Sequence, residues 1–593
     1  MADKSSIKLL RRFLGEAFTH RRTLILVLIA IVGSSLASLA SPYILGYAID
    51  KYIVPGKWEG LPVIAGIYLG ALLAQWGFST MRTWYVQVFG QKVLYDLRNR
   101  AFQRLLQGKI DYYKDKQTGD LVSRVINDTS IVNEVFISGL LGSLGSLLSL
   151  IGIIIAMLLL NIQLTLVALA TVPLMVIAAK YFGGRMRRAY RETREKIAKV
   201  SSIVEESVSG IEAIKSYRQE EHVTREFDRA GRETIRAFLK VAIYMGIFWP
   251  LMNLATIISV AAVLIYGTYL VSIAATSIGV VAAFVQYVQR FRGPINNVVS
   301  LYDSLQSALA SLERIYDIID GVESEEEGGL SIEKLEGKIE YRNVYFEYEK
   351  GRPVLKNVTF TVEPGESIAI VGETGAGKTT LVNLLMKFYL PTSGEILLDG
   401  IDIASINTRS LRSRIAYVPQ ETYLFPGTIM DNIRISKPEA SDEEVVEICK
   451  TLGIHEFITR LPNGYETDAG EAGKRLSTGE KQLIAIARAM LKDPDIVVLD
   501  EALSSVDPKT ESLIRRAMKK LMKDRTSILI AHRLSMALEA DRIIVLENGE
   551  IVEMGTPREL LERKGKFYSL YKAQMESAVA SYSLPLTRGR TLD

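Results

Sequence analysis

The chain has 593 residues, which is long enough for several domains. Hydrophobic residues make up 48% of it, which indicates a membrane protein with a large soluble part. Its single cysteine, Cys449, excludes an intrachain disulfide, and we expect that side chain to be a small buried apolar group.

The net charge of +4 is divided unevenly along the chain. Residues 1–320 carry 35 Lys and Arg against 24 Asp and Glu, whereas the remaining residues carry 36 against 43. Basic loops tend to stay on the cytoplasmic side of a membrane, so the positive half fits a membrane domain. The charge does not indicate a nucleic-acid partner.

The first predicted element is an amphipathic helix over residues 5–20. Its apolar face carries Leu9, Leu10, Phe13, Leu14 and Phe18, and its opposite face carries Lys8, Arg11 and Arg12. Such a helix lies flat on a membrane surface, and we expect this one on the cytoplasmic side. The apolar run that begins at Thr23 has no convincing cleavage site, so we expect a retained span rather than a signal peptide.

Six apolar stretches are long enough to cross a bilayer, which needs about 20 helical residues. They cover residues 23–49, 60–80, 135–160, 163–182, 242–271 and 276–300. An even number of spans puts both chain ends on one side. The short connections at 161–163 and 272–277 carry no Lys or Arg, whereas residues 92–124 and 185–240 carry many. We therefore expect both termini in the cytoplasm.

The charged sequence between the fourth and fifth spans favours helix but is too polar to enter a membrane. Two helices of about 25 residues, rising about 1.5 Å per residue, would project some 37 Å into the cytoplasm. We expect these arms to connect the membrane domain to the domain that follows.

Polar residues gather on one face of the sixth span. They include Gln286, Arg290 and Asn297, and Trp249 and Asn253 flank Pro250 on the fifth span. Polar groups inside a membrane are costly unless they face water or another helix, so this face is a candidate lining of a substrate path. The alternatives are packing between helices, or an Arg290 that reaches the inner membrane interface.

A change in composition follows the sixth span. Residues 321–338 are rich in Glu and Gly and are predicted to be a linker, a second domain follows over 339–576, and 577–593 lack any periodic pattern and are predicted to be a disordered tail. The predicted fold is an all-α domain of six transmembrane helices with long cytoplasmic extensions over residues 1–320, followed by an α/β domain.

The second domain contains a glycine-rich phosphate loop between an apolar run, 367–371, and a helical pattern, 381–386. It fits the pattern G-x-x-x-x-G-K-S/T and consists of Gly372, Glu373, Thr374, Gly375, Ala376, Gly377, Lys378 and Thr379, with Thr380 next in the chain. In such loops the backbone amides hold phosphates, the lysine reaches the outer phosphates and the hydroxyl faces Mg²⁺. We therefore expect a P-loop NTPase.

A second motif, Ile496-Val-Val-Leu-Asp500-Glu501, is a buried strand that ends in two carboxylates. Asp500 suits a magnesium ion reached through water, and Glu501 suits the positioning or deprotonation of an attacking water. Before it lies Leu476-Ser-Thr-Gly-Glu-Lys-Gln482.

This last segment resembles the L-S-G-G-Q signature of ATP-binding cassette (ABC) proteins, and further matches follow in the order of that family. Tyr348 resembles the aromatic residue that stacks on adenine, although Tyr345 and Phe346 are adjacent aromatics. Gln420 resembles the Q-loop glutamine, Ser504-Ser-Val-Asp507 the D-loop, and His532 the switch histidine. The resemblance covers essentially the whole chain.

The resemblance implies a site for ATP and Mg²⁺. The phosphate loop would hold the phosphates, with Thr379, Gln420 and Asp500 at the metal. Glu501 would activate water, and His532 would hold the γ-phosphate. ABC domains bind ATP between two subunits, so Ser477 and Gly479 would cap the nucleotide of a partner. Asp507 of the D-loop is a further candidate for contact with nucleotide.

Two segments in the arms, 111–124 and 206–217, resemble the coupling regions of ABC exporters. The resemblance implies ATP-driven export of amphipathic or hydrophobic compounds, such as drugs or lipids, across the cytoplasmic membrane by alternating access. A homodimeric lipid flippase and an ATP-gated channel or regulatory receptor are the alternatives.

The signature departs from the family pattern at two positions. Thr478 replaces a glycine and Glu480 replaces the glutamine, and both changes would weaken the capping of a phosphate. Heterodimeric ABC exporters often combine such a signature with an intact Glu and His in one subunit. We therefore expect a second half-transporter as partner, with a homodimer as the alternative.

Overall fold

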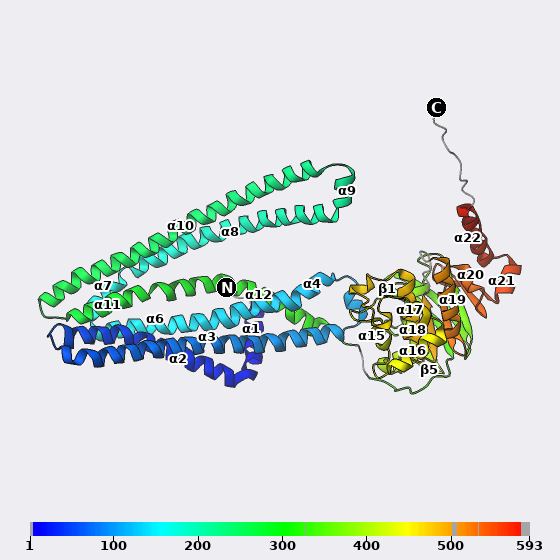
Figure 1. Ribbon diagram of the computed structural model, residues 1–593, viewed down its shortest axis with the longest axis horizontal. Helices are drawn as coiled ribbons and strands as arrows, with labels where there is room; N and C mark the ends of the chain where they lie inside the picture. Colours follow the sequence, from blue (N-terminus) through cyan, green and yellow to red (C-terminus); the bar gives the residue numbers. More distant parts are fainter. Residues whose placement is uncertain (1–3, 326–327, 501–506, 532, 583–593) are drawn as a thin grey trace, which may run out of the picture. The chain divides into compact units, whose positions relative to one another are not determined.

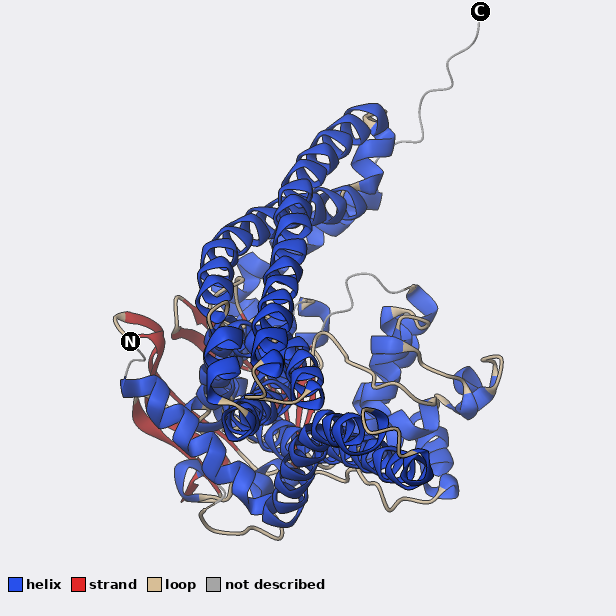
Figure 2. Ribbon diagram, turned by 90° about the vertical axis from the view of Figure 1, so that its left-hand side faces the viewer, coloured by secondary structure: helices blue, strands red, loops and turns tan. Residues whose placement is uncertain are grey.

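The computed structural model of the protein describes residues 4–325, 328–500, 507–531 and 533–582. It divides into two compact units. The helical unit comprises Met1–Leu106 and Lys116–Val322, and the α/β unit comprises Gln107–Asp115 and Glu323–Asp593. All strands of the described residues belong to the α/β unit (Figure 2).

The helical unit is built from long helices. They are α1 (Lys4–Ala17), α2 (Arg21–Ala48), α3 (Leu61–Leu106), α4 (Thr118–Ser123), α5 (Thr129–Val132), α6 (Leu141–Leu160), α7 (Ile162–Leu169), α8 (Val172–Ser209), α9 (Ile211–Ser216), α10 (Glu220–Ser272), α11 (Ile278–Arg290) and α12 (Arg292–Gly321). Short turns of 3₁₀ or π helix join several of them: η1 (Phe18–His20), η2 (Ile49–Ile53), η3 (Trp58–Gly60), η5 (Arg124–Asp128) and η6 (Asn133–Leu140).

Within the described residues, five helical segments are long and apolar enough to cross a membrane: Lys8–Ile53, Trp58–Leu106, Thr118–Leu160, Ile162–Ser209 and Glu220–Ser272. The sixth predicted span, 276–300, is divided into α11 and α12. Pro294 explains the break, because it has no N–H to offer the carbonyl of Arg290 one turn earlier.

The predicted arms are the ends of α8 and α10 that meet at α9, and there the two helices run side by side (Figure 1). Their facing sides bury small residues such as Ala189 and Thr193. Two ion pairs cross the seam, Lys196 to Glu233 at 2.8 Å and Lys240 to Glu192 at 2.7 Å. The arms are thus held as a hairpin by packing along their length.

Helix α11 packs against the C-terminal half of α2 with very little space between the two backbones. A Cβ atom on Gly279 would lie 2.0 Å from the carbonyl oxygen of Gly46, so only glycine fits there. Next to this contact, Asp50 accepts hydrogen bonds from the Ser277 hydroxyl and from the backbone N–H of Gly279, the latter at 2.7 Å. This carboxylate therefore caps the first turn of α11.

The α/β unit contains two sheets. Its strands are β1 (Ile339–Glu349), β2 (Arg352–Val362), β3 (Ser367–Val371), β4 (Ser393–Leu398), β5 (Ile401–Asp402), β6 (Ile415–Val418), β7 (Ile496–Asp500), β8 (Thr526–Ile530), β9 (Arg542–Glu547) and β10 (Glu550–Gly555). The first sheet is antiparallel in the order β2-β1-β4-β5. The second has the order β10-β9-β3-β8-β7-β6 and is parallel except for β10.

Helices cover both sheets. They are α13 (Lys378–Leu385), α14 (Thr408–Arg414), α15 (Ile429–Arg434), α16 (Asp442–Leu452), α17 (His455–Thr459), α18 (Thr478–Leu491), α19 (Pro508–Met522), α20 (Leu534–Ala537), α21 (Pro557–Arg563) and α22 (Lys566–Tyr582), with short 3₁₀ turns η4 (Ile110–Tyr113), η7 (Ile403–Ser405), η8 (Gly464–Glu466) and η9 (Glu471–Gly473). Helix α22 includes residues 577–582, which were predicted to belong to the disordered tail, and 583–593 lie outside the described residues.

Cys449 is fully buried on α16, and its burial raises the pKa of the thiol to about 11. A shift of this size lowers the thiolate fraction about 100-fold, and the surrounding core also excludes reagents. We expect a water-soluble disulfide reagent to leave the folded protein unmodified and to titrate its one thiol only after denaturation. Rapid labelling of the native protein would contradict this burial.

Candidate nucleotide-binding site

The phosphate loop connects β3 to α13 at the carboxyl edge of the second sheet. Gly372, Gly375 and Gly377 have φ values of +158°, +86° and +103°. A Cβ on Gly372 would lie 2.3 Å from the carbonyl oxygen of Leu546, and one on Gly377 would lie 2.8 Å from the Leu355 side chain. The loop therefore needs glycine at these two positions to keep its curve.

Lys378 begins α13, and its side chain folds back into the loop. Its Nζ donates hydrogen bonds to the carbonyl oxygens of Gly372 at 2.8 Å and Glu373 at 2.9 Å. The side chain is 6% exposed, and this burial lowers the pKa of the ammonium while the nearby charge of Asp500 opposes the shift. The cation thus lies at the centre of the loop, with the Thr379 hydroxyl position exposed beside it.

Asp500 ends β7, which is separated from β3 by β8. Parallel strands bring their carboxyl ends to one edge, so the carboxylate lies near the phosphate loop. Tyr417 on the adjacent β6 forms a hydrogen bond with Asp500. Burial, with a contribution from that carboxylate, raises the pKa of Tyr417 to about 12, so the tyrosine is a neutral donor. Nothing in the sequence indicated this partner of Asp500 beyond its place shortly before Gln420.

Tyr348 lies against α13. Its hydroxyl is 3.3 Å from the Thr380 hydroxyl and accepts a hydrogen bond of 3.2 Å from the amide of Asn383. The neighbouring Phe346 is only 5% exposed, so it has no free face for a ligand. Tyr348 therefore lies beside the helix that follows the phosphate loop.

The segment 107–115 folds onto this same region of the α/β unit. Its backbone is hydrogen-bonded to residues 323–325. The N–H of Lys109 donates to the carbonyl oxygen of Glu323 at 2.9 Å, and the N–H of Glu325 donates to the carbonyl oxygen of Gln107 at 2.8 Å. The ammonium of Lys114 lies 4.9 Å from the centre of the Tyr348 ring, in a cation–π contact. Sequence analysis placed 111–124 in a coupling region but did not identify this contact.

Gln420 follows strand β6, whereas Asp507 lies at the start of helix α19. Gln420 is exposed two residues after β6. Asp507 is the N-cap of α19 and accepts hydrogen bonds from the backbone N–H groups of Lys509 and Thr510, both at 3.1 Å. The side chain of Asp507 thus has a structural role in this arrangement. Glu501, His532 and the other D-loop residues 504–506 lie outside the described residues.

The signature segment begins α18. Ser477 is the N-cap, and its hydroxyl accepts a hydrogen bond from the backbone N–H of Glu480. The Glu480 carboxylate in turn accepts a hydrogen bond of 2.7 Å from the N–H of Ser477, which completes a capping box. Gly479 is buried in the same turn. A negative charge of the chain itself therefore lies at the amino end of this helix.

The predicted substrate residues do not form one group. Arg290 donates to the carbonyl oxygen of Ser38 and to the hydroxyl of Ser41, the latter at 2.8 Å, and Tyr287 donates to the carbonyl oxygen of Leu39 at 2.8 Å. The Ser38 carbonyl lies one turn before Pro42, which has no N–H to offer it. This arrangement favours packing between helices as the role of Arg290.

The other candidates remain separate from this contact. Gln286 is half-buried on α11, and Trp249 and Asn253 are exposed on α10. The side chain of Asn297 lies outside the described residues.

Replacing Arg290 with leucine is expected to destabilise the helical unit by about 1–2 kcal/mol, because the Ser38 carbonyl would lose its donor away from water. Thermal unfolding of the purified protein would show this as a lower midpoint, with Arg290→Lys closer to the parent protein. The matched control is Gln289→Leu on an exposed neighbouring position. Equal midpoints for both leucine variants would contradict the packing role.

Comparison with known proteins agrees with both units. Residues 24–295 match the family model for the ABC transporter transmembrane region, and residues 355–504 match that for the ABC transporter. YgaD of Bacillus subtilis, whose name assigns it to multidrug export, is 36% identical across 93% of this chain and 97% of its own. A fatty acid ABC transporter ATP-binding/permease protein of Mycobacterium bovis is 36% identical across 88% of this chain and 83% of its own.

A solved structure is also similar over most of the chain. A bacterial Atm1-family ABC exporter with ATP bound superposes with a TM-score of 0.76 and 26% identity, over 96% of this chain and 99% of the other. The predicted fold class, a helical transmembrane domain followed by an α/β ATPase, is confirmed. This chain therefore belongs to the ABC transporter family: it is a membrane-bound exporter whose transmembrane region and transport-coupled ATPase are joined in one polypeptide.

Proposed function

We propose that the chain is one half of a heterodimeric exporter that moves an amphipathic or hydrophobic compound out of the cytoplasm. In this proposal the α/β unit and both termini are cytoplasmic, which the basic segments 92–124 and 185–240 and the uncharged opposite loops support. ABC exporters act as dimers of half-transporters, so the chain needs a second subunit to work.

The nucleotide site would work by positioning and charge neutralisation. Lys378 would exchange its contacts with the Gly372 and Glu373 carbonyls for phosphate oxygens, which suits a buried ammonium close to Asp500. Tyr348 would stack on adenine. Glu501 would orient the attacking water and His532 would contact the γ-phosphate.

Magnesium fits the residues at this edge. Thr379 offers a hydroxyl, Asp500 a carboxylate and Gln420 an amide oxygen, and oxygen ligands of this kind, together with phosphate and water, suit Mg²⁺. A bound Mg²⁺ would neutralise charge on the transferred phosphoryl group. Tyr417 would hold the Asp500 carboxylate in place through its hydrogen bond.

The observation that carries the heterodimer is the capping box at the signature. Helix α18 would present its amino end to the γ-phosphate of the partner's nucleotide, as helix amino ends bind anions. Here Glu480 already supplies a carboxylate to the N–H of Ser477. This internal anion competes with phosphate by charge and by occupying the donor, so this half would supply the catalytic residues and its partner the stronger signature.

The double replacement Thr478→Gly and Glu480→Gln is expected to raise ATP hydrolysis by the purified chain alone by about fivefold or more, since removing one charge at a helix end changes anion binding by about 1 kcal/mol. Glutamine can still close the capping box, so the helix start is kept. The matched control is Glu471→Gln, an exposed carboxylate earlier in the same segment. No gain over this control would argue against the inhibitory charge.

The direct test is ATP hydrolysis by this chain purified alone in lipid nanodiscs, with Glu501→Gln as the blank. Turnover at the blank level, restored by a co-expressed second half-transporter, is the expected result. Robust turnover that depends on Glu501 would instead establish a working homodimer, and a clean dimer of this chain purified from its own host would lead to the same conclusion.

The substrate class rests on the relatives, whose names include multidrug export and fatty acid transport. A fatty acid has a long apolar chain, which fits the amphipathic or hydrophobic compound proposed here. Gln286, Trp249 and Asn253 remain our candidates for contact with such a compound. Uptake of a labelled fatty acid or drug into inside-out vesicles against a gradient would separate a transporter from an ATP-gated channel, which cannot accumulate its substrate.

A further inference from the structure

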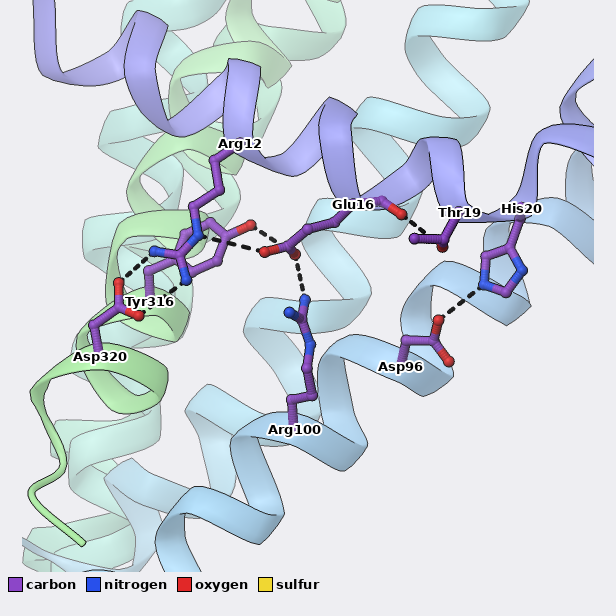
Figure 3. Close-up of polar contacts among 8 residues, drawn as sticks. All are labelled: Arg12, Glu16, Thr19, His20, Asp96, Arg100, Tyr316 and Asp320. Carbon is purple, nitrogen blue, oxygen red and sulfur yellow. Dashed lines mark hydrogen bonds and ion pairs between the residues drawn. The ribbon is translucent and has the colours of Figure 1, made fainter.

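The amino-terminal helix α1 is fixed to the helical unit by a network of charged groups (Figure 3). Glu16 lies at its centre and accepts a hydrogen bond of 2.9 Å from the Tyr316 hydroxyl and an ion pair from Arg100. Arg12 contacts the same glutamate and also reaches Asp320, with one N–O distance of 2.9 Å. The network joins α1 to both α3 and α12.

A second set of contacts fixes the turn between α1 and α2. His20 lies 2.9 Å from the carboxylate of Asp96 on α3, and Lys92 donates to the Thr23 hydroxyl at 3.2 Å. These contacts hold the turn against α3, and His20, Lys92 and Asp96 also line the space beside it.

A groove of about 610 Å³ lies between this turn and α3. One end is lined by Trp84 and Val88, and the other by His20, Lys92 and Tyr95. Trp84 and Tyr95 are 69% and 68% exposed, although both are large aromatic side chains. Trp84 and Lys92 are two helical turns apart, about 12 Å along α3. The groove thus has an apolar end and a basic, hydrogen-bonding end, separated by about the length of a lipid headgroup and its glycerol.

The helices on either side of the turn at His20 carry exposed basic residues. They are Lys8 and Arg11 on α1 and Arg21 and Arg22 at the start of α2. One acidic group, Asp96, also lines this end, 2.9 Å from His20, whereas Glu16 is paired with Arg12 and Arg100. Clusters of four or more basic residues beside a membrane helix attract anionic headgroups, and tryptophan and tyrosine prefer the same depth.

We propose that this groove binds one anionic phospholipid of the cytoplasmic leaflet. Its phosphate would lie at Lys92 and His20, and its first acyl carbons would pack on Trp84 and Val88. The proposal rests on the orientation given above, which places this end of α3 at the inner surface. It does not depend on ATP hydrolysis or on the identity of the exported compound.

The groove contains one of only four tryptophans, so its occupancy has a direct signal. Replacing Trp58, Trp76 and Trp249 with phenylalanine leaves Trp84 as the single tryptophan of the full-length protein, which can be excited apart from the tyrosines. The experiment compares nanodiscs that contain phosphatidylglycerol or phosphatidylcholine with brominated acyl chains, at equal mole fraction and without nucleotide. We expect brominated phosphatidylglycerol to quench Trp84 at a lower mole fraction, by about fivefold, as one well-placed lysine contributes about 1 kcal/mol.

Lys92→Gln should remove most of this preference, and Lys92→Arg should keep it. The matched control is Lys180→Gln, an exposed lysine on α8 that is not part of the groove. Equal quenching by the two lipids in the parent single-tryptophan protein would overturn the site. A loss of preference that is as large for Lys180→Gln would overturn it too, because it would mean a general attraction to the basic surface. Both results can be obtained from a protein with no ATPase activity, so they do not depend on the outcome for the exporter.

Discussion

Replacing Lys378 with alanine is expected to lower ATP hydrolysis by at least about 100-fold, in whichever subunit arrangement the protein turns over. The ammonium is the only charged side chain that bonds to the carbonyls of Gly372 and Glu373 among the described residues. Its removal would leave the outer phosphates without a fixed cation in a buried site, where electrostatic stabilisation of phosphoryl transfer is large. Steady-state phosphate release by the purified complex in nanodiscs measures the effect.

The control for Lys378 is Lys387→Ala. This lysine also donates to backbone carbonyls, those of Ala404 at 3.0 Å and Ile406 at 2.6 Å, but it lies beyond the end of α13. Its replacement should cost stability without a comparable loss of turnover per folded molecule. If both alanine variants lost activity equally and in proportion to their unfolding, the role assigned to Lys378 would be wrong.

Gly279→Ala is expected to destabilise the helical unit by about 3 kcal/mol, at the upper end of the cost of overpacking. The added methyl group would lie 2.0 Å from the Gly46 carbonyl oxygen and 2.5 Å from Asp50 Oδ2. The first of these atoms belongs to a helix backbone and cannot move alone, so α11 would have to separate from α2 and loosen the cap of its first turn. Thermal unfolding of the detergent-purified protein, followed by intrinsic fluorescence, measures the change.

Gly77→Ala on α3 provides the matched control, since a Cβ there would meet no atom within 4 Å. Alanine favours helix over glycine by about 1 kcal/mol, so this control should leave the midpoint unchanged or raise it. A Gly279→Ala midpoint equal to that of the control would show that the two helices are not in close contact in the membrane.

Much of the fold and part of the site follow from local patterns in the sequence. The phosphate loop, the Asp500 strand and the arms depend on residues that are near one another in the chain, so spacing and periodicity were sufficient. The capping box at Ser477 and Glu480 is also a local signal, S-x-x-E, and could have been found, but the resemblance to the ABC signature drew attention to phosphate capping instead.

The features that sequence analysis missed depend on distant partners. Arg290 was considered for a substrate path because its own helix face is polar, yet its acceptors lie near Pro42, about 250 positions away. Tyr417 and Lys114 were missed for the same reason, because their partners Asp500 and Tyr348 belong to other elements. Periodicity identifies a polar face, but it does not identify the group that the face contacts.

The assignment of Gln107–Asp115 to the α/β unit has a mechanical consequence. The chain passes between the two units at three places, after Leu106, after Asp115 and after Val322, and not only at the linker. Helix α3 therefore ends at a covalent attachment to the unit that carries the ATPase, and helix α4 begins shortly after another. A rotation of that unit would therefore pull on α3, α4 and α12 together, through three chain connections. A single flexible connection would transmit almost no torque to the membrane helices.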